Sequence, residues 1–451
     1  MSKQEMHLGV ILHPYGSHVA AWLSGDAPLG AEIDVDHYTN VAQIAERAAL
    51  DLIFFADVPA VREGNLQAIR RWPMFAAQFE PVTVLGMLAG KTSKIGLAAT
   101  ASTSYSEPYN LARQFASLDH LSKGRIGWNV VTTSSAAAAL NFGSNPRADH
   151  QARYSRATEF LTIAKALWDS WDDDAFTRDR ETGLFFDAEK LHTLNFSGEH
   201  FSVKGPLNIA RPPQGHPVII QAGGSAPGRD LAARTADVVF SAEPEIDAGR
   251  AFYKDVKDRA VAYGRDADDV KILVALMPIV GRTRSEADDI LADLQERIHP
   301  DVGREIMSYD LGGIDLSDVA DDDVFPMEKV PTSTQGGQSF LRYFQELIQQ
   351  EGGATVKELY KYYSIARGSK FAVGSAADVA DLMEDWTSSR AADGFMCVFP
   401  TFPNGFRRFT ELVVPELQRR GLFRKGYQGN TLREHLRLKK PGSVYKKVQA
   451  S

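Results

Sequence analysis

The feature that most constrains this chain is a series of short, almost continuously apolar segments that alternate with stretches typical of helices. Segments of this kind are expected of strands that are buried on both faces of a parallel sheet. The eight segments are His7–Leu12, Leu52–Ala56, Ile95–Thr100, Arg125–Val131, Val218–Gln221, Val238–Ser241, Ile272–Val280 and Phe395–Phe399. A strand followed by a helix, repeated eight times, predicts an α/β fold of the closed (β/α)8 TIM-barrel type, with an open doubly wound sheet as the alternative.

Helix signals lie between these segments. Three of the predicted helices begin with a proline in their first turn, where the missing N–H has no helical partner to lose. The predicted helices are Asn40–Leu50, Pro81–Ala89, Pro108–Leu121, Pro227–Thr235 and, after the last strand, Arg407–Arg420. Gly421 is well placed to end the last of these, because glycine readily adopts the left-handed conformation found after helix ends.

Two intervals are too long to be bare connections, and we interpret them as large insertions after strands 4 and 7. The first covers about 132–217 and the second about 281–394, and a basic C-terminal extension covers about 422–451. We expect the whole chain, 1–451, to form a single barrel domain. The helices and hairpin predicted within the insertions are Arg153–Trp171, a hairpin around Leu194–Leu207, Ser285–Ile298, Gly337–Gln350, Val356–Ala366 and Ala376–Ser389.

Composition excludes several classes of protein. The 451 residues carry 50 Lys and Arg against 58 Asp and Glu, a formal net charge of −8, which argues against a nucleic-acid partner. Cys397 is the only cysteine, so no intramolecular disulfide can form, and a cytoplasmic location is expected. No apolar window is long enough for a membrane span. The eleven histidines are scattered, so we predict no metal site.

The chemistry of a TIM barrel lies where its strands end at the C-terminal face. The residues at these points are rich in uncharged hydrogen-bonding groups, and no G-x-G-x-x-G dinucleotide fingerprint follows any strand. The residues are His13, Asp57, Ser102, Thr103, Asn129, Thr132, Gln221 and Ser241. Together with the absence of a net positive charge, this favours a small or neutral partner.

One of these strand ends leads into a turn suited to phosphate. Gly223, Gly224 and Ser225 lie between a buried strand and a helix that begins near Pro227, where main-chain N–H groups and a hydroxyl can meet an anion. The alternative is a tight turn in which Ser225 only caps the helix. His150 and Tyr154, four residues apart at the start of an inserted helix, can reach one ligand, with simple packing as the alternative.

Several longer motifs resemble those of the bacterial-luciferase-like flavin monooxygenases, in the branch of nitrilotriacetate, EDTA and dibenzothiophene-sulfone monooxygenases. The similar blocks run in order along nearly the whole chain. They are Leu118-Asp119-His120-Leu121-Ser122-Lys123-Gly124-Arg125, Gly127-Trp128-Asn129-Val130-Val131-Thr132, Phe55-Ala56-Asp57, Ser102-Thr103-Ser104-Tyr105, His150-Gln151-Ala152-Arg153-Tyr154, Gly205-Pro206-Leu207-Asn208, Pro217 to Gly223, Ala391-Ala392-Asp393-Gly394-Phe395 and Gly429 to Glu434.

This resemblance implies a TIM barrel with insertions that acts as a two-component monooxygenase. Its cofactor would be FMN, supplied as FMNH2 by a separate NAD(P)H:flavin reductase, and O2 would react through a C4a-peroxyflavin to oxygenate a small organic substrate. Site roles follow by the same resemblance. Asp57, Thr103 and Asn129 would line the isoalloxazine, His150 and Tyr154 the ribityl-phosphate side, and Gly224 with Ser225 the phosphate.

The chain departs from the family pattern at two places. Many members carry a Trp-Arg pair after the first strand, but here Trp22 is followed by Leu23, and no histidine lies between His299 and His435. His18 is the candidate catalytic residue, as a hydrogen-bonding or acid–base group near the flavin, with loop packing as the alternative. In the second insertion Phe340, Tyr343, Phe344 and Tyr360 are either pocket walls or core.

Substrate and assembly stay open at this stage. An aminopolycarboxylate, an organosulfur compound, an alkane or a flavin would each suit the fold. The rival functions are a deazaflavin-dependent oxidoreductase, which would turn over without O2, and a non-catalytic flavin-binding barrel. A homodimer or homotetramer is expected, with no nucleic-acid or membrane partner.

Overall fold

The computed structural model of the chain describes residues 5–446 apart from 75, 134, 145–149, 317, 332–340, 342–343, 346–347 and 349–352. The side chain of His150 also lies outside the described residues, as do Phe340 and Tyr343. The helix predicted near Gly337–Gln350 falls mostly on these positions, so its prediction stays open.

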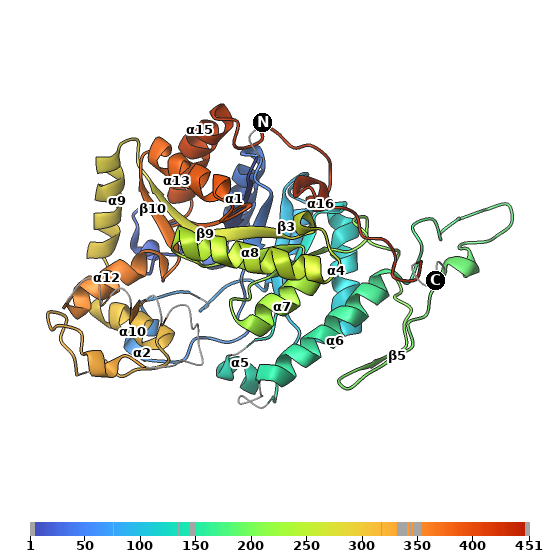
Figure 1. The fold of residues 1–451 in the computed structure, drawn as a ribbon, viewed down its shortest axis with the longest axis horizontal. Helices are drawn as coiled ribbons and strands as arrows, with labels where there is room; N and C mark the ends of the chain where they lie inside the picture. The colour runs from blue at the N-terminus through green and yellow to red at the C-terminus, as the bar shows by residue number, and fades with distance from the viewer. Residues whose placement is uncertain are drawn as a thin grey trace.

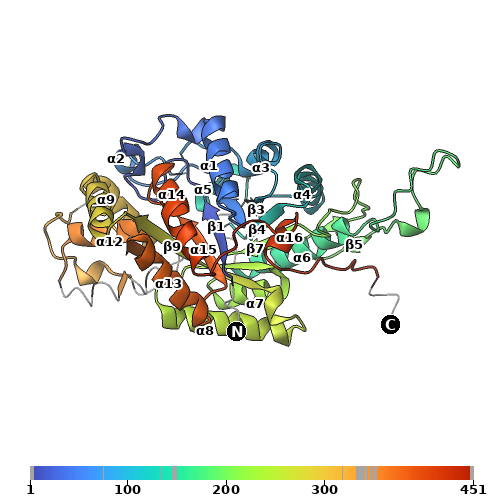
Figure 2. The ribbon, with the colours of Figure 1, turned by 90° about the horizontal axis from the view of Figure 1, so that it is seen from above.

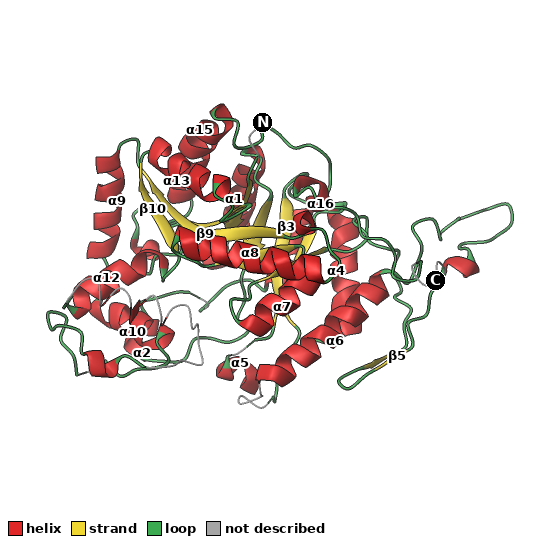
Figure 3. Ribbon diagram, in the orientation of Figure 1, coloured by secondary structure: helices red, strands yellow, loops and turns green. Residues whose placement is uncertain are grey.

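The sheet at the centre of the molecule closes on itself (Figures 1 and 3). Its strands run in the order β10-β9-β11-β1-β2-β3-β4-β7-β8, and a further pairing of β8 with β9 completes the ring. The eight strands of the ring are β1 (His7–Ile11), β2 (Leu52–Phe55), β3 (Gly96–Ser102), β4 (Ile126–Val131), β7 (Val218–Gln221), β8 (Val238–Ser241), β9 (Lys271–Val280) and β11 (Gly394–Val398). All neighbours are parallel, so the predicted (β/α)8 barrel is confirmed and the open sheet is excluded.

A ninth parallel strand, β10 (Lys370–Gly374), was not predicted. It pairs with Leu276–Val280 of β9, beyond the part of β9 that lies in the ring. Three of its five residues are only partly buried, so it lacks the continuous apolar character of the barrel strands. Its position depends on the length of β9, which offers ten buried residues for pairing.

Helices surround the barrel on its outer side (Figure 2). The prolines at Pro81 and Pro108 begin their helices as predicted, and Gly421 follows the last long helix with φ of +70°. α8 was not predicted. The surrounding helices are α1 (Val35–Arg47), α3 (Pro81–Ala89), α4 (Pro108–Ser122), α7 (Ala226–Thr235), α8 (Ile246–Ala262), α13 (Ala376–Ser388), α14 (Asn404–Arg408) and α15 (Val414–Arg419), the last two joined by a π-helical turn, Phe409–Val413.

The two insertions extend from different sides of the barrel in both views (Figures 1 and 2). The first contains α5 (Ala136–Asn141), α6 (His150–Trp168) and the predicted hairpin, β5 (Phe196–Ser197) with β6 (Ser202–Val203). The second contains α9 (Arg284–Glu296), α10 (Pro300–Asp310) and α12 (Val356–Ala366).

The second insertion has its own apolar cluster. Phe344 and Tyr360, offered above as pocket walls or core, are 0% and 1% exposed in it, so they are core residues. Val19, Ala20 and Trp72 from the loops after β1 and β2 pack into the same cluster. The insertion is therefore fastened to these two loops at the barrel rim.

The C-terminal extension closes one end of the barrel. Leu432 and Leu436, in and just after α16 (Leu432–His435), are fully buried in the cluster formed by the inward-facing side chains of the strands. A Cβ placed on Gly96 would clash with Leu432 Cδ1, so the plug requires glycine there. Because Gly96 is the first residue of β3, this is the N-terminal end of the barrel, and the open end is the C-terminal one.

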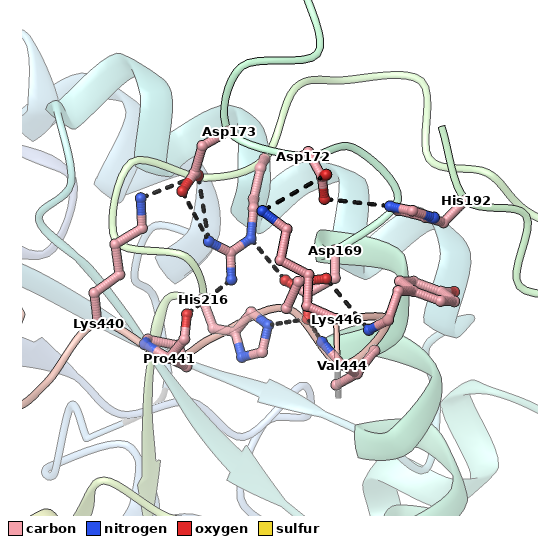
Figure 4. Close-up of polar contacts among 12 residues, drawn as sticks. Asp169, Asp172, Asp173, His192, His216, Lys440, Pro441, Val444 and Lys446 are labelled. Carbon is pink, nitrogen blue, oxygen red and sulfur yellow. Dashed lines mark hydrogen bonds and ion pairs between the residues drawn. The ribbon is translucent and has the colours of Figure 1, made fainter. Parts of the chain in front are cut away.

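The last part of the extension is fastened to the end of α6 by charged groups (Figure 4). Asp169 Oδ1 accepts a hydrogen bond from Arg211 Nε at 2.7 Å, and Oδ2 accepts one from the Val444 N–H at 2.9 Å and lies 3.0 Å from His216 Nε2. Lys440 binds Asp173 at 3.0 Å. The basic tail therefore forms a strap, residues 439–446, over the first insertion.

Two general findings bear on function. None of the described helices combines the length and apolar character needed to cross a membrane. Among the same residues, no group of three or more His, Cys, Asp or Glu side chains is arranged to hold a metal ion.

Candidate active site

Side chains alternate between the barrel interior and the surrounding helices. On β4, Ile126, Trp128 and Val130 pack outward in the main core, so Gly127 and Asn129 point inward. The same alternation points Thr100 of β3 into the barrel, because Ala99 and Ala101 pack outward. The barrel interior is thus polar at the neighbouring strands β3 and β4, through Thr100 and Asn129.

These two inward residues form a buried pair. Asn129 Nδ2 donates a hydrogen bond of 2.9 Å to Thr100 Oγ1, and the two residues are directly opposite in the sheet register. Asn129 is 5% exposed, and its Oδ1 is buried without a partner among the described residues. A buried amide oxygen without a donor costs about 1–3 kcal/mol, so its retention points to a ligand that supplies an N–H.

Thr103, at the end of β3, is 1% exposed. Its hydroxyl donates to the Val131 carbonyl at 3.1 Å, and its own carbonyl accepts from Arg156 Nε of α6 at 3.2 Å. The hydroxyl oxygen keeps its capacity to accept. Thr103 therefore joins the ends of β3 and β4 to the inserted helix.

Asp57 follows β2 and borders a cavity of about 570 Å³ that continues between α3 and α4. Partial burial, and then the negative charge of Glu80, raise the pKa of Asp57 to about 6. Thr100 and Ser102 of β3 and Tyr105 line the same cavity. A carboxyl group with this pKa accepts or donates a hydrogen bond close to neutral pH.

The glycine turn after β7 meets the inserted helix α6. A Cβ placed on Gly228 would lie 3.0 Å from Gly223 Cα, 3.1 Å from Ser225 Oγ and 3.1 Å from the Tyr154 hydroxyl. The Tyr154 hydroxyl and Ser225 Oγ, far apart in sequence, therefore both lie beside Gly228. Gly228, which sequence reasoning did not single out, allows this approach because it has no side chain.

Ser225 caps α7, as its Oγ accepts from the Gly228 N–H at 3.2 Å. Gly224 and Ser225 are exposed, at the N-terminus of a ten-residue helix. The capping interpretation is thus observed, and it is compatible with an anion, because the first-turn N–H groups and the helix dipole face the same space. His150 is the first residue of α6, one turn before Tyr154.

The loop after β1 carries two histidines, the half-buried His13 and the buried His18. His18 is 2% exposed, and burial lowers its pKa to about 4. Its Nδ1 accepts from the Ala20 N–H at 3.2 Å, so in the neutral ring the proton is on Nε2, which is buried and lacks a partner within the described structure. His13 has its pKa lowered to about 4 by burial and then by the charge of Arg367.

The two histidines line one small cavity of about 20 Å³ with Trp22, Trp72 and Met74. Because β1 pairs with β2, this cavity lies at the same end of the barrel as Asp57. Sequence reasoning identified the strand ends, but it could not identify the Trp72 wall, since that ring comes from the middle of a long loop.

Comparison with known proteins agrees with this geometry. Residues 16–393 match the family model described as luciferase-like monooxygenase. The chain is 46% identical to N-acetyl-S-(2-succino)cysteine monooxygenase of Bacillus subtilis (strain 168), with 99% of each chain covered. It is 43% identical to nitrilotriacetate monooxygenase component A of Aminobacter aminovorans, with 98% of each covered.

Among solved structures, a riboflavin lyase crystallised with modified FMN and riboflavin superimposes with a TM-score of 0.83 at 31% identity, covering 96% of this chain and 95% of that one. The match spans the barrel, both insertions and the strand ends described above. The chain therefore belongs to the luciferase-like monooxygenase family.

Proposed function

We propose that this chain is the oxygenase component of a two-component monooxygenase that receives FMNH2 from a separate NAD(P)H:flavin reductase and uses O2 to oxygenate a small organic substrate. The observation that carries the proposal is the buried Asn129 Oδ1, which lies inside the barrel and has no donor among the described residues. An isoalloxazine ring has N–H groups that can meet it.

The phosphate end of the flavin has a matching place one strand away. Asn129 is opposite Ile220 in the register of β4 and β7, and the glycine turn follows β7 directly. Neighbouring strands lie about 4.8 Å apart, so the ring site and the turn are on the same edge of the barrel. Gly224 and Ser225 would hold the phosphate, with His150 and Tyr154 beside it.

When bound, reduced FMN supplies the two electrons that activate O2. The residues of the chain would orient and enclose it. Asp57 and Thr103 would hydrogen-bond at the rim of the ring, and His18 Nε2–H would donate to an oxygen of the substrate or of the oxidant. No step in this scheme needs a dinucleotide site in the chain, because NAD(P)H would react at the reductase.

The named relatives are all monooxygenases, but their substrates differ. Homologues are named for nitrilotriacetate, dibenzothiophene sulfone, long-chain alkanes and dimethyl sulfide. Aminopolycarboxylate, organosulfur, alkane and flavin-type substrates are all within the proposal at this level.

The test is to load the protein with FMNH2 without oxygen, mix it rapidly with oxygenated buffer, and follow flavin reoxidation by absorbance. We expect the flavin to stay bound and to reoxidise more slowly than free FMNH2. Reoxidation at the rate of free flavin, with no retention by the protein, would overturn the proposal. Retention of a deazaflavin with oxygen-independent hydride transfer would favour the rival oxidoreductase.

The proposal extends to the whole chain as one functional domain in a cytoplasmic homo-oligomer, a homodimer or homotetramer. The single-domain part of this proposal is supported by the contacts that the C-terminal plug and both insertions make with the barrel. Light scattering of the purified protein would measure the assembly directly.

A further inference from the structure

A groove leads from the proposed flavin site to the surface of the molecule. It is the cavity of about 570 Å³ beside Asp57, and it lies between α3 and α4, which are neighbours in Figure 2. Its inner wall includes Thr100, the buried residue that binds Asn129 inside the barrel. We call this cavity the α3–α4 groove. Its outer wall is one face of α4, formed by Asn110, Arg113, Gln114, Ser117 and Leu118.

The α3–α4 groove is long enough and polar enough to hold water. From Asn110 to Leu118 it follows α4 for about 12 Å. At the Leu118 end the two helices are in contact, because a Cβ placed on Gly86 of α3 would lie 3.6 Å from Leu118 Cδ2. Arg113 and Gln114 are exposed, so the groove opens to solvent beside them. A polar space of this size holds several water molecules, since each occupies about 30 Å³ in the liquid.

Two acidic side chains face the groove at different depths. Asp57 is half-buried and follows β2 at the barrel rim, whereas Glu80 is exposed and precedes α3. Among the described residues that line the groove, the charged or titratable side chains are those of Asp57, Glu80, Tyr105 and Arg113. The groove therefore connects a half-buried carboxyl group at the flavin site with an exposed carboxylate and with solvent.

Glu80 is held in place by three hydrogen bonds. Its Oε1 accepts from the Val82 N–H at 2.9 Å, and its Oε2 accepts from the Thr83 N–H at 2.7 Å and from the Thr83 hydroxyl at 2.6 Å. These bonds make Glu80 the N-cap of α3, where the helix dipole favours a negative charge. The position of this charge relative to the groove is therefore fixed by the fold.

The charge of Glu80 acts on Asp57. Burial, and then this charge, raise the pKa of Asp57 to about 6, and the hydrogen bond from the Val58 N–H opposes them only in part. An acid–base group works best when its pKa lies near the pH of the reaction, because it then both gives and takes up a proton readily. Asp57 has this property and lies at the inner part of a route to solvent.

We propose that Asp57 supplies protons to the flavin site, that the α3–α4 groove is the route by which solvent replaces them, and that Glu80 is the positioning residue that controls the protonation of Asp57. The inference rests on the proposed function, because it assigns a step at that same site. It adds an acid–base role to the hydrogen bond already proposed for Asp57, and it gives Glu80 a role that sequence reasoning did not suggest.

The protons of this step balance as follows. Without substrate, O2 takes two electrons and two protons from the reaction and becomes hydrogen peroxide. Neutral reduced flavin supplies both protons from its ring, but reduced flavin that has lost one ring proton supplies one. The carboxyl group of Asp57 supplies the other, and water in the groove then returns a proton to its carboxylate.

The first experiment measures the protonation of Asp57 without flavin. Urea unfolding compares wild type with Asp57→Asn at pH 4 to 8, and Glu80→Gln with the double variant. In the wild-type background the difference in stability should grow from about pH 4 and level off near pH 6. In the Glu80→Gln background it should level off about half a pH unit lower or more, because a negative charge is gone. The altered helix cap is common to both members of that pair and cancels.

Two further variants are controls. Glu80→Asp keeps both the charge and a capping side chain, so its curve should resemble that of the wild type. Glu107→Gln removes a carboxylate from the N-cap position of α4, where Glu107 is exposed and makes no side-chain capping bond. Because the groove is lined by other residues, this change should leave the curve of Asp57 where it is.

The second experiment adds the flavin. Each protein is loaded with FMNH2 without oxygen and mixed with oxygenated buffer at pH 5.5 to 8.5, and reoxidation is followed without substrate. The wild-type rate should fall as the pH rises through an inflection, and Glu80→Gln should move that inflection down by about half a unit or more. Asp57→Asn should reoxidise bound flavin about tenfold more slowly below the inflection and should lose the inflection that depends on residue 80.

The outcomes separate this inference from the proposed function. If Glu80→Gln changes neither the unfolding curve nor the inflection, Glu80 does not control Asp57. If Asp57→Asn retains FMNH2 and reoxidises it with the wild-type pH profile, the proton route is wrong and the monooxygenase proposal stands. If the wild type fails to retain FMNH2, the proposed function fails, and the inference fails with it.

Discussion

Asn129 Nδ2 and Thr100 Oγ1 are joined by a 2.9 Å hydrogen bond inside the barrel, and the other polar atom of the amide, Oδ1, is buried without a partner among the described residues. We predict that Asn129→Ala weakens FMNH2 binding about tenfold, because a hydrogen bond from the flavin is lost. Asn129→Leu should weaken it further, since its side chain occupies the ring site.

Anaerobic titration with FMNH2 measures this effect. Asn404→Ala, an exposed amide outside the barrel, is the control. FMNH2 affinity unchanged in both Asn129 variants would remove the residue from the flavin site.

The Tyr154 hydroxyl and Ser225 Oγ each lie 3.1 Å from the point that a Cβ on Gly228 would occupy. If they hold the phosphate, Tyr154→Phe and Ser225→Ala should each lower affinity for FMN about 5- to 20-fold and leave affinity for riboflavin unchanged. Isothermal titration with both flavins makes the comparison. A parallel loss for FMN and riboflavin would indicate a structural role, and Gly228→Ala should impair FMN binding by displacing Tyr154.

Ionisation of Asp57 should lower the free energy of unfolding of the flavin-free protein as the pH rises. Its folded pKa of about 6 lies above the ordinary 3.8, so both states are protonated below about pH 4, and above about pH 6 the folded state bears the cost of ionisation. The shift of about two units corresponds to ~3 kcal/mol, which partial exposure reduces to ~1 kcal/mol. Asp57→Asn should therefore be the more stable protein at pH 8, with the difference vanishing near pH 4.

Urea unfolding of both proteins at several pH values tests this. Greater stability of the wild type at pH 8 would show that a favourable partner, and not burial, dominates at Asp57.

His18 presents an Nε2–H that is buried and unpartnered within the described residues. Removing it in His18→Leu should leave FMNH2 affinity within twofold and lower substrate-coupled product formation by about 10²-fold or more. His18→Gln, whose amide N–H can take the place of Nε2–H, should retain part of the activity. Because the pKa of His18 is about 4, the wild-type rate should show no inflection from this residue between pH 5.5 and 8. Equal loss in both variants would point to loop packing.

The strap depends on Asp169, which is 0% exposed and bound by Arg211 and the Val444 N–H. Burial opposes its ionisation, but His216, Arg211 and the Val444 N–H outweigh burial and hold the pKa below 3.8. Asp169→Asn should lower the free energy of unfolding by about 3 kcal/mol at pH 7, because a buried charge loses its partner.

This stabilisation is present above pH 3.8 and is lost as the pH falls through the depressed pKa, so the two proteins should converge in acid. The control is Asp174→Asn. Asp174 forms an ion pair with Lys190, and its side chain is 72% exposed. This substitution should leave stability nearly unchanged, because exposed ion pairs contribute little.

Local patterns along the chain were enough for most of the barrel. The eight apolar segments coincide with the eight strands of the ring, because each is buried on both faces and must read as apolar. Helices with proline in the first turn were also predicted, because proline at that position loses no helical hydrogen bond. β10 was missed because three of its five residues are only partly buried. α10 carries buried residues at helical spacing, including Val302 and Ile306, so its pattern was present in the sequence and was not recognised.

Some features of the site could be predicted from the sequence, and others depended on the tertiary structure. That polar residues follow the strands, that Ser225 begins a helix after two glycines, and that no disulfide can form are properties of the sequence by itself. The meeting of Tyr154 with Ser225, the unpartnered Oδ1 of Asn129 and the groove shared by Asp57 and Glu80 were decided only by the tertiary structure. The physical reason is that hydrogen bonding and burial depend on groups brought close by barrel closure and by the insertions, and local sequence pattern does not record those distances.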